Sequence, residues 1–294
     1  MPKIDAQQVR KLREASGAGI MDCKNALEEA EGSIEDALQE LRKRGISDAE
    51  EFSDREAEEG RISFLDLSSD HISSVVMAEV NCETDFTAKN DEFIEFSDNV
   101  VENVVDTQKD FSEDFDDFND LFEEEVAEIT SKVGEKVVVR RVRFSSSKTS
   151  VVGTYIHPGN QIVSCVFLKR DDDLSLKDWD HKDREVLEDL ASEVAMHVAA
   201  LDPPYLDESD IPEKVLETRK GLYRDQAKKA GQPDHVLDQI VEGTLNKWKK
   251  ESSLLGQNFV REPEFSVKEF VQKETDLDVE VDFFVRLEVG ELEG

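Results

Sequence analysis

The chain has 294 residues, of which 70 are acidic and 36 are basic, so its formal net charge is −34 at pH 7. A charge this negative repels nucleic-acid phosphates and anionic lipid headgroups, which argues against direct binding of nucleic acid or of a membrane surface. Apolar residues make up 38% of the chain, which is enough for packed cores, and a chain of this length is expected to divide into two or more domains.

Residues 1–45 are predicted to form a module of three short helices. Asp5 can cap the first helix, Gly17-Ala18-Gly19 then interrupts the chain, and Ser33 can cap a third helix that Gly45 is expected to end. Apolar side chains recur at helical spacing in each segment. Because so few residues give only a marginal core, the module is better suited to docking than to catalysis.

Residues 46–60 are dominated by Asp and Glu, which indicates a solvated linker or an exposed helix at a domain boundary. Two apolar runs at 61–67 and 72–80 follow and predict a β-hairpin. A helix with an apolar stripe and a β-rich run at 137–144 complete a first α+β subdomain, which we assign to residues 61–145.

Residues 110–128 contain ten acidic residues and no Lys or Arg. Apolar residues recur in this segment every three or four positions, at Phe111, Phe115, Phe118, Leu121 and Phe122. The spacing favours short amphipathic helices packed over a core, although so dense a run of like charges could equally form a loose flap.

The second half repeats this plan in pattern. Apolar runs at 149–157 and 161–169 flank the turn Pro158-Gly159-Asn160, and a helix is expected at about 183–200. An alternating run at 279–289 predicts a strand with one buried face that completes the second sheet. We therefore assign a second α+β subdomain to residues 146–210 and 251–294.

Between these two parts, residues 211–250 are predicted to form two helices joined by Gly231-Gln232-Pro233, as a protruding antiparallel hairpin. Lys and Arg outnumber Asp and Glu from Lys214 to Lys250, which makes the hairpin locally basic. It is a candidate contact for an acidic partner, and a solvated helical arm of ordinary charge is the equal alternative.

The sequence lacks the motifs of common enzymes. There is no GxxxxGK[ST] phosphate loop, no GxSxG turn and no HExxH helix, and the five histidines have no metal-ligand spacing. We expect no catalysis, no metal, no cofactor and no nucleotide bound by this chain alone.

His197 lies in an apolar helix, where a core histidine is a better interpretation than a catalytic base. Cys23, Cys82 and Cys165 form no CxxC pair, so we expect reduced, packed thiols.

Residues 81–87 form a polar turn between a buried strand and a helix. Thr84 or Asp85 can cap that helix, and Phe86 can then fold back as a hydrophobic staple. If Phe86 is exposed at the tip, it suits an anchor for a pocket on a partner. The residues alone leave both interpretations open.

Two segments resemble the translation elongation factor Ts family: residues 12–27, LREASGAGIMDCKNAL, and residues 80–86, VNCETDF. The similarity continues through residues 133–135, 196–200, 255–260 and 286–290, and so covers nearly the whole chain. It implies an α+β protein with an N-terminal three-helix module similar to ubiquitin-associated domains, a core of two α+β subdomains with antiparallel sheets, and a protruding antiparallel helical hairpin.

The resemblance also implies a function. Members of the family are guanine-nucleotide exchange factors, not enzymes, and bind elongation factor Tu through its G domain and a second domain. A Thr-Asp-Phe turn is pushed toward the magnesium and GDP site of the partner, and Thr84, Asp85, Phe86 and Thr87 match that turn. Thr87 stands where valine is usual. The resemblance suggests six further partner-binding candidates: Arg13, Gly17, Gly19, Met21, His157 and His197.

Other interpretations remain at this point. The chain could be a polypeptide-binding adaptor that acts through the three-helix module, or a hydrolase with an unrecognised acidic pair.

The start of the chain lacks a signal-peptide pattern, and no stretch approaches the ~20 apolar residues of a membrane span, so we expect a cytoplasmic protein. We interpret the acidic excess as adaptation of a halophilic bacterium to a salty cytosol, with an ordinary acidic protein as the alternative.

Overall fold

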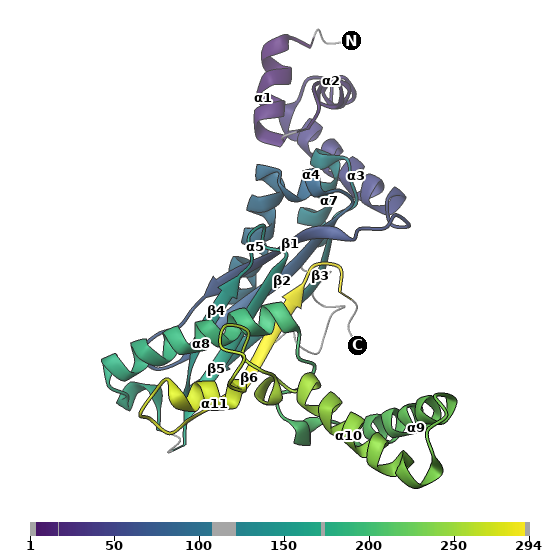
Figure 1. The fold of residues 1–294 in the computed structure, drawn as a ribbon. Helices are drawn as coiled ribbons and strands as arrows, with labels where there is room; N and C mark the ends of the chain where they lie inside the picture. Colours follow the sequence, from purple (N-terminus) through teal and green to yellow (C-terminus); the bar gives the residue numbers. More distant parts are fainter. Residues whose placement is uncertain (1–3, 17, 108–121, 172–173, 292–294) are drawn as a thin grey trace.

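The computed structural model of the chain describes residues 4–16, 18–107, 122–171 and 174–291. The molecule is elongated, with a helical module at one end, two antiparallel three-stranded sheets in the middle and a helical hairpin at the other end (Figure 1). The class is α+β, as expected. The predicted segment 110–128 lies largely outside the described residues, and Phe122 is buried in the core of the first sheet.

The N-terminal module contains α1 (Ala6–Ser16), α2 (Ile20–Glu29) and α3 (Ile34–Glu51). Their apolar stripes meet in a small core that includes the fully buried Leu12, Cys23 and Leu27. The expectation that Gly45 ends the third helix is wrong, because α3 continues to Glu51. A single glycine costs a helix only about 1 kcal/mol, and α3 packs against α7, which offsets this cost.

The first sheet has the order β1-β2-β3 and consists of β1 (Glu59–Asp66), β2 (Ser73–Cys82) and β3 (Val138–Ser147). The predicted hairpin is confirmed by the antiparallel pairing of β1 with β2. The described helices of this half are α4 (Asp85–Ala88), α5 (Asp91–Thr107) and α7 (Glu123–Val133). The apolar sides of α5 and α7 pack on one face of this sheet and the second sheet packs on the other, so every residue of the central strand β2 is buried.

The second sheet has the order β4-β5-β6 and consists of β4 (Ser150–Ile156), β5 (Ile162–Arg170) and β6 (Val279–Glu288). Its outer face is covered by α8 (His181–Leu201), and α11 (Val267–Lys273) leads into β6. The antiparallel pairing of β6 with β5 confirms that the chain returns to this sheet after the helical hairpin.

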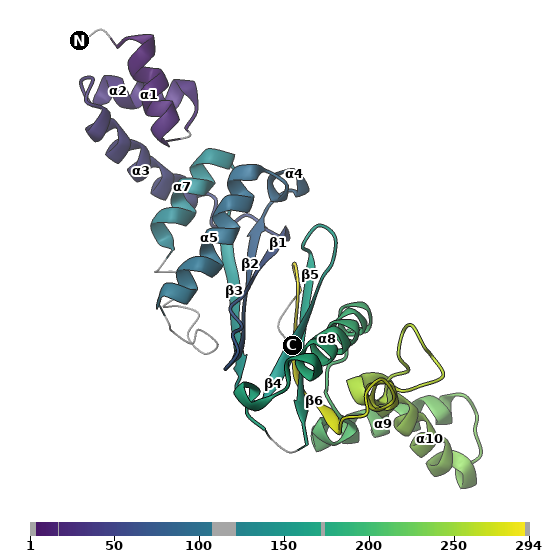
Figure 2. The same cartoon turned by 90° about the vertical axis from the view of Figure 1, so that its left-hand side faces the viewer.

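The two sheets share a core. Ile62, Val75 and Met77 of the first sheet pack with Val163 and Phe167 of the second. In the view of Figure 2 the sheets lie side by side, with α5 and α7 outside one and α8 outside the other. The inner face of each sheet is therefore buried by the other sheet.

Strand β6 departs from the expected single buried face. Val279 and Val281 pack in the core under α8, whereas Phe283, Val285 and Leu287 pack in the core between the sheets. The register of β5 and β6 shifts between Phe167 and Leu168, which leaves an extra residue in β6. Because one added residue reverses the direction of all side chains beyond it, the alternating run serves two cores.

The predicted hairpin is formed by α9 (Glu213–Lys229) and α10 (Asp234–Ser252), which extend away from the sheets (Figure 1). Leu237, Val241 and Leu245 of α10 are buried, and most of α9 is exposed. The described residues also include three short 3-10 segments: Leu176–Asp178, Glu208–Asp210 and Leu254–Gly256.

Candidate functional site

The polar turn after β2 forms the short helix α4, and Thr84 caps its N-terminus. The Thr84 hydroxyl accepts a hydrogen bond from the Thr87 backbone N–H at 3.4 Å. Capping by a threonine side chain satisfies one of the free N–H groups of the first helical turn. The chain therefore reverses sharply at the end of a buried strand, which places Asp85 and Phe86 at the tip.

Phe86 is 83% exposed, the largest exposure among the large apolar side chains of the described residues. This exposure excludes the hydrophobic staple, in which Phe86 would fold back on its own helix. Thr87 is only 7% exposed and packs inward. The turn thus exposes Phe86 and Asp85 to solvent, while the side chain of Thr87 packs against the protein.

Asp85 forms an ion pair with Lys89, with 2.7 Å between Lys89 Nζ and Asp85 Oδ2. The hydrogen bond that Lys89 donates to the Asp85 carboxylate raises the pKa of the Lys89 ammonium group. Both side chains are exposed, so the pair contributes little to stability. Asp85 remains accessible to a partner.

Two carboxylates hold the turn in place: Glu135, which lies outside it, and Glu83, which belongs to it. Glu135 accepts from Thr84 twice, from the backbone N–H at 3.0 Å and from the hydroxyl at 2.7 Å. Glu83 accepts from the Lys136 backbone N–H at 2.7 Å and from Arg55 at 3.1 Å. Sequence reasoning gave Glu135 no role, although the segment at 133–135 belongs to the resemblance and Gly134 ends α7 in the left-handed conformation typical of a helix end.

Below the turn lies the buried thiol of Cys82. Its Sγ donates a hydrogen bond to the Thr84 carbonyl oxygen at 3.2 Å. Burial, with a smaller contribution from the charge of Glu135, raises the pKa of Cys82 to about 12. All three cysteines are buried and free, as the sequence predicted, and this thiol is a packing group rather than a nucleophile.

The candidates in the N-terminal module lie around the start of α2, far along the chain from α4. Met21 is 61% exposed and its neighbour Ile20 is 57% exposed, so two apolar side chains face solvent together. Gly19 precedes α2, and Arg13 is exposed on α1. Gly17 lies outside the described residues.

His157 lies on the turn between β4 and β5 and is exposed, with its Nδ1 3.2 Å from the Tyr155 hydroxyl. This turn is fixed to the first sheet, because the Ile62 N–H donates to the Asn160 carbonyl oxygen at 2.7 Å. The turn and α4 lie at the same end of the sheets in Figure 2. The fold therefore brings His157 and the Phe86 turn to the same end of the two sheets.

His197 is fully buried, so direct contact with a partner does not fit its position. Its Nδ1 accepts from the Val260 N–H at 3.1 Å, which leaves Nε2 to donate to Gln257 at 2.9 Å. Burial lowers the pKa of this imidazole, and the hydrogen bond to Gln257 opposes the shift. His197 is a core residue, as the apolar helix predicted.

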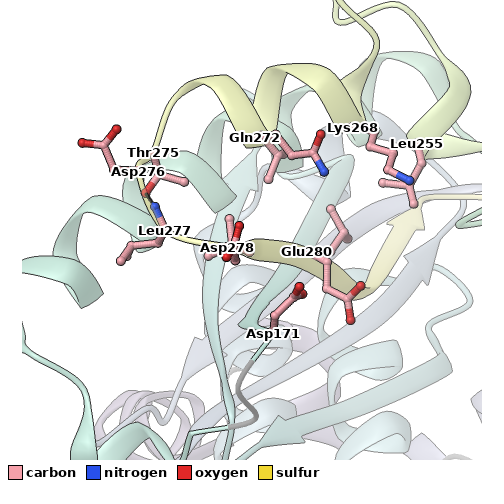
Figure 3. Close-up of a pocket in the computed structure, with 12 residues that line it drawn as sticks. Asp171, Leu255, Lys268, Gln272, Thr275, Asp276, Leu277, Asp278 and Glu280 are labelled. Atoms are coloured by element: carbon pink, nitrogen blue, oxygen red, sulfur yellow. Dashed lines mark hydrogen bonds between the residues drawn. The ribbon is translucent and has the colours of Figure 1, made fainter.

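A cavity of about 430 Å³ lies between α11 and the adjoining ends of β5 and β6 (Figure 3). The lining includes four carboxylates and the side chains of Gln272 and Lys268; the acids are Asp171, Asp276, Asp278 and Glu280. Excess negative charge disfavours phosphate and other anions. The cavity is also at the opposite end of the sheets from α4, so it is not part of this site.

Two features are absent from the part of the chain that the structure describes. No three His, Cys, Asp or Glu side chains are grouped there so that they could hold a metal ion. Among the described helices, none combines the length and apolar character needed to cross a bilayer.

Comparison with known proteins gives a consistent result. Residues 83–291 match the sequence model of the family described as elongation factor TS. The chain is 37% identical to elongation factor Ts of a Nitratiruptor species, with 98% of this chain and 93% of that protein covered. Identity to elongation factor Ts of Aquifex aeolicus is 35%, with 98% and 99% covered. The protein of Hydrogenovibrio crunogenus with the same name is 36% identical, with 98% and 92% covered. The chain belongs to the elongation factor Ts family.

Proposed function

We propose that this chain is a guanine-nucleotide exchange factor that binds elongation factor Tu, weakens its magnesium and GDP site and so promotes GDP release during translation elongation. Family membership supports the exchange role. The single structural observation that carries the mechanism is Phe86, which is 83% exposed at the tip of a turn held by several hydrogen bonds. An exposed aromatic on a rigid support is suited to enter a pocket of a partner.

Exchange of this kind needs no covalent step. A factor that binds the empty partner more tightly than the GDP-bound partner must weaken GDP binding by the same ratio. Insertion of Phe86 beside the phosphate-binding loop and of Asp85 near the magnesium ion would favour the empty state, in which the pocket is free to open. GTP then refills the site because it is abundant. In this proposal the chain is not an enzyme and uses no metal, cofactor or nucleotide of its own.

Docking is assigned to the N-terminal module, residues 1–45, and to the end of the sheets that carries His157. Exposed Met21 and Ile20 supply apolar contact area at the start of α2. The proposal includes contacts with the G domain and with a second domain of elongation factor Tu. The proposal places the chain in the cytoplasm, where elongation occurs, and the net charge of −34 disfavours direct contact with RNA or membranes.

The test is stopped-flow release of a fluorescent GDP from the cognate elongation factor Tu. The intact chain should accelerate release, and Phe86→Ala should lose about thirtyfold of that acceleration, because an interface hot spot contributes ~2 kcal/mol or more. Val186→Ala is the matched control, since Val186 is an exposed apolar residue on α8 and lies outside the contacts assigned here. Equal acceleration of GDP release by the intact chain and by Phe86→Ala would contradict the role proposed for the turn.

The exposed Ile20 and Met21 also suit the alternative function, a polypeptide-binding adaptor that acts through the three-helix module. The similarity of this module to ubiquitin-associated domains, which the family resemblance implies, is likewise a proposal. It predicts that the chain binds ubiquitin-like proteins or peptides without elongation factor Tu, which titration calorimetry measures. Met21→Ala should then abolish peptide binding and leave GDP release unchanged.

A further inference from the structure

The Phe86 turn is held by groups that lie far from it in sequence. Thr84 and Glu135 are separated by 51 positions, and one carboxylate of Glu135 receives both the N–H and the hydroxyl of Thr84. Two bonds to one carboxylate fix both the position and the direction of the residue that begins α4. Phe86 follows two residues later, so its direction depends on this contact.

Glu135 is itself placed by α7. Gly134 ends that helix with φ of 71° and ψ of 20°, a backbone conformation that glycine adopts at little cost. Nothing lies within 4 Å of where a Cβ of Gly134 would be, so it is the backbone conformation and not space that requires glycine here. The reversal at Gly134 directs Glu135 back toward the end of β2.

A second set of contacts joins the same region to the segment that follows α3. Lys136 donates through Nζ to the carbonyl oxygens of Ser53 and Arg55, and Arg55 pairs with Glu83 at 3.1 Å. Helix α3 of the N-terminal module packs along α7. The module, α7 and the Phe86 turn are therefore linked by one continuous set of contacts.

From this geometry we propose that Glu135 is a positioning residue for nucleotide exchange: it sets the orientation in which Phe86 meets elongation factor Tu, and it does so through Thr84. The proposal rests on the proposed role of the Phe86 turn. Glu135 does not touch the partner in this account. Its contribution is preorganisation, because a turn that is already fixed loses little conformational freedom when it enters a pocket.

The experiment measures GDP release from elongation factor Tu with the full-length chain and four variants: Glu135→Ala, Glu135→Gln, Phe86→Ala and the double variant of Phe86→Ala with Glu135→Ala. Glu135→Ala should slow release about tenfold, the effect expected for the loss of hydrogen bonds to one charged group. Glu135→Gln should restore most of the rate, because its amide can still accept from the Thr84 N–H and donate to the Thr84 oxygen. Glu125→Ala is the control, an exposed acid in the first turn of α7.

The double variant separates positioning from other roles. If Glu135 acts only through the turn, adding Glu135→Ala to Phe86→Ala should cost less than Glu135→Ala costs alone, because only Asp85 is left on the turn to be misplaced, whereas an independent role gives additive losses and overturns the proposal. If Phe86→Ala slows release and Glu135→Ala does not, the positioning role alone is wrong. If Phe86→Ala has no effect, the role of the turn itself fails.

Melting curves accompany each rate, so that a loss of folded protein is not mistaken for a loss of positioning. Should the alanine variant fail to fold, Glu135→Leu replaces it, because leucine fills a similar space and accepts no hydrogen bond. A folded leucine variant with a normal rate of GDP release would overturn the proposal.

Discussion

Phe86 and Asp85 stand side by side on α4, and both are accessible. Removal of the Phe86 side chain should leave the melting temperature nearly unchanged, since an exposed ring contributes little to the core; a buried aromatic would cost roughly 3 kcal/mol or more. Asp85→Ala should slow GDP release in the same direction as Phe86→Ala. Because both side chains serve one displacement, the double variant should lose less than the sum of the two single losses. Independent, additive losses would argue for two separate contacts.

His197 gives the fold a dependence on pH. Burial lowers its pKa below the ordinary value of 6.5, so the folded chain holds the neutral imidazole while the unfolded chain protonates more readily. The resulting stability is fully present above pH 6.5 and is lost as the pH falls from there through the lower folded pKa.

Urea unfolding at pH 7.5 and pH 5.5 checks this expectation. His197→Gln removes the titrating group and should show a smaller loss of unfolding free energy between the two conditions than the unsubstituted chain. His157→Gln, which changes an exposed histidine, is the control and should behave like the unsubstituted chain. Equal pH dependence in all three proteins would contradict the assignment to His197.

At the scale of elements, the two sheets are joined by a buried ion pair. Glu79 of β2 is fully buried and accepts from Arg141 of β3 at 2.5 Å and from the Gly290 N–H, just after β6, at 2.7 Å. Arg141 in turn donates to the Glu288 carbonyl oxygen. Glu79→Ala leaves Arg141 buried without its partner and should destabilise the fold by about 3–5 kcal/mol.

Glu280→Ala is the matched control for that change, because Glu280 forms an ion pair with Lys169 on the surface at 3.0 Å. Exposed pairs contribute about 0–1 kcal/mol, so this variant should unfold at nearly the same denaturant concentration as the unsubstituted chain. Chemical denaturation of both variants measures the difference. Similar losses in the two would mean that the buried pair adds no net stability.

We expect the N-terminal module to be needed for binding to elongation factor Tu and to contribute only modestly to the stability of the rest of the chain. Deletion of residues 1–45 should weaken binding to elongation factor Tu and leave both sheets folded, since the module has its own core. It also removes part of α3 from α7, so the melting temperature should fall modestly. Calorimetric titration and thermal melting give the two quantities. Unchanged affinity for elongation factor Tu would refute the docking role.

Local patterns in the sequence predicted most of these elements. The two hairpins follow from apolar runs around polar turns, and the return of β6 follows from the alternation of Val279, Val281 and their successors. The length of α3 was not predictable, because Gly45 is a local stop signal that packing on α7 overrides. The bulge in β6 likewise depends on pairing with β5, which no local pattern in β6 contains.

The candidate site was also predictable only in part. The sequence identified Thr84, Asp85 and Phe86 through a family motif and left open whether Phe86 is exposed, because exposure depends on the packing around the turn. Glu135 could not be assigned from the residues, since its contact with Thr84 spans 51 positions. Burial of His197 was expected from its apolar helix, yet the hydrogen bonds to Val260 and Gln257 come from a distant loop.

For the whole molecule, the net charge of −34 makes stability and activity depend on the salt concentration. Repulsion among so many like charges destabilises the compact state when it is unscreened. We therefore predict that the chain is more stable, and more active in exchange, at ~2 M than at ~0.1 M KCl, where the screening length is about 10 Å. Circular dichroism against KCl concentration measures this. Equal stability at both concentrations would remove the interpretation as a salt-adapted protein from a halophilic bacterium.

The pairing of Glu79 with the Gly290 N–H has a consequence for how the protein is made. These groups are 211 positions apart, so a growing chain exposes the carboxylate of Glu79 long before Gly290 has been synthesised. The inner face of the first sheet is likewise uncovered until the second sheet forms against it. On the ribosome, the first half therefore cannot reach its final stability during its own synthesis. A translation factor built in this way completes its folding only when β6 has emerged from the exit tunnel.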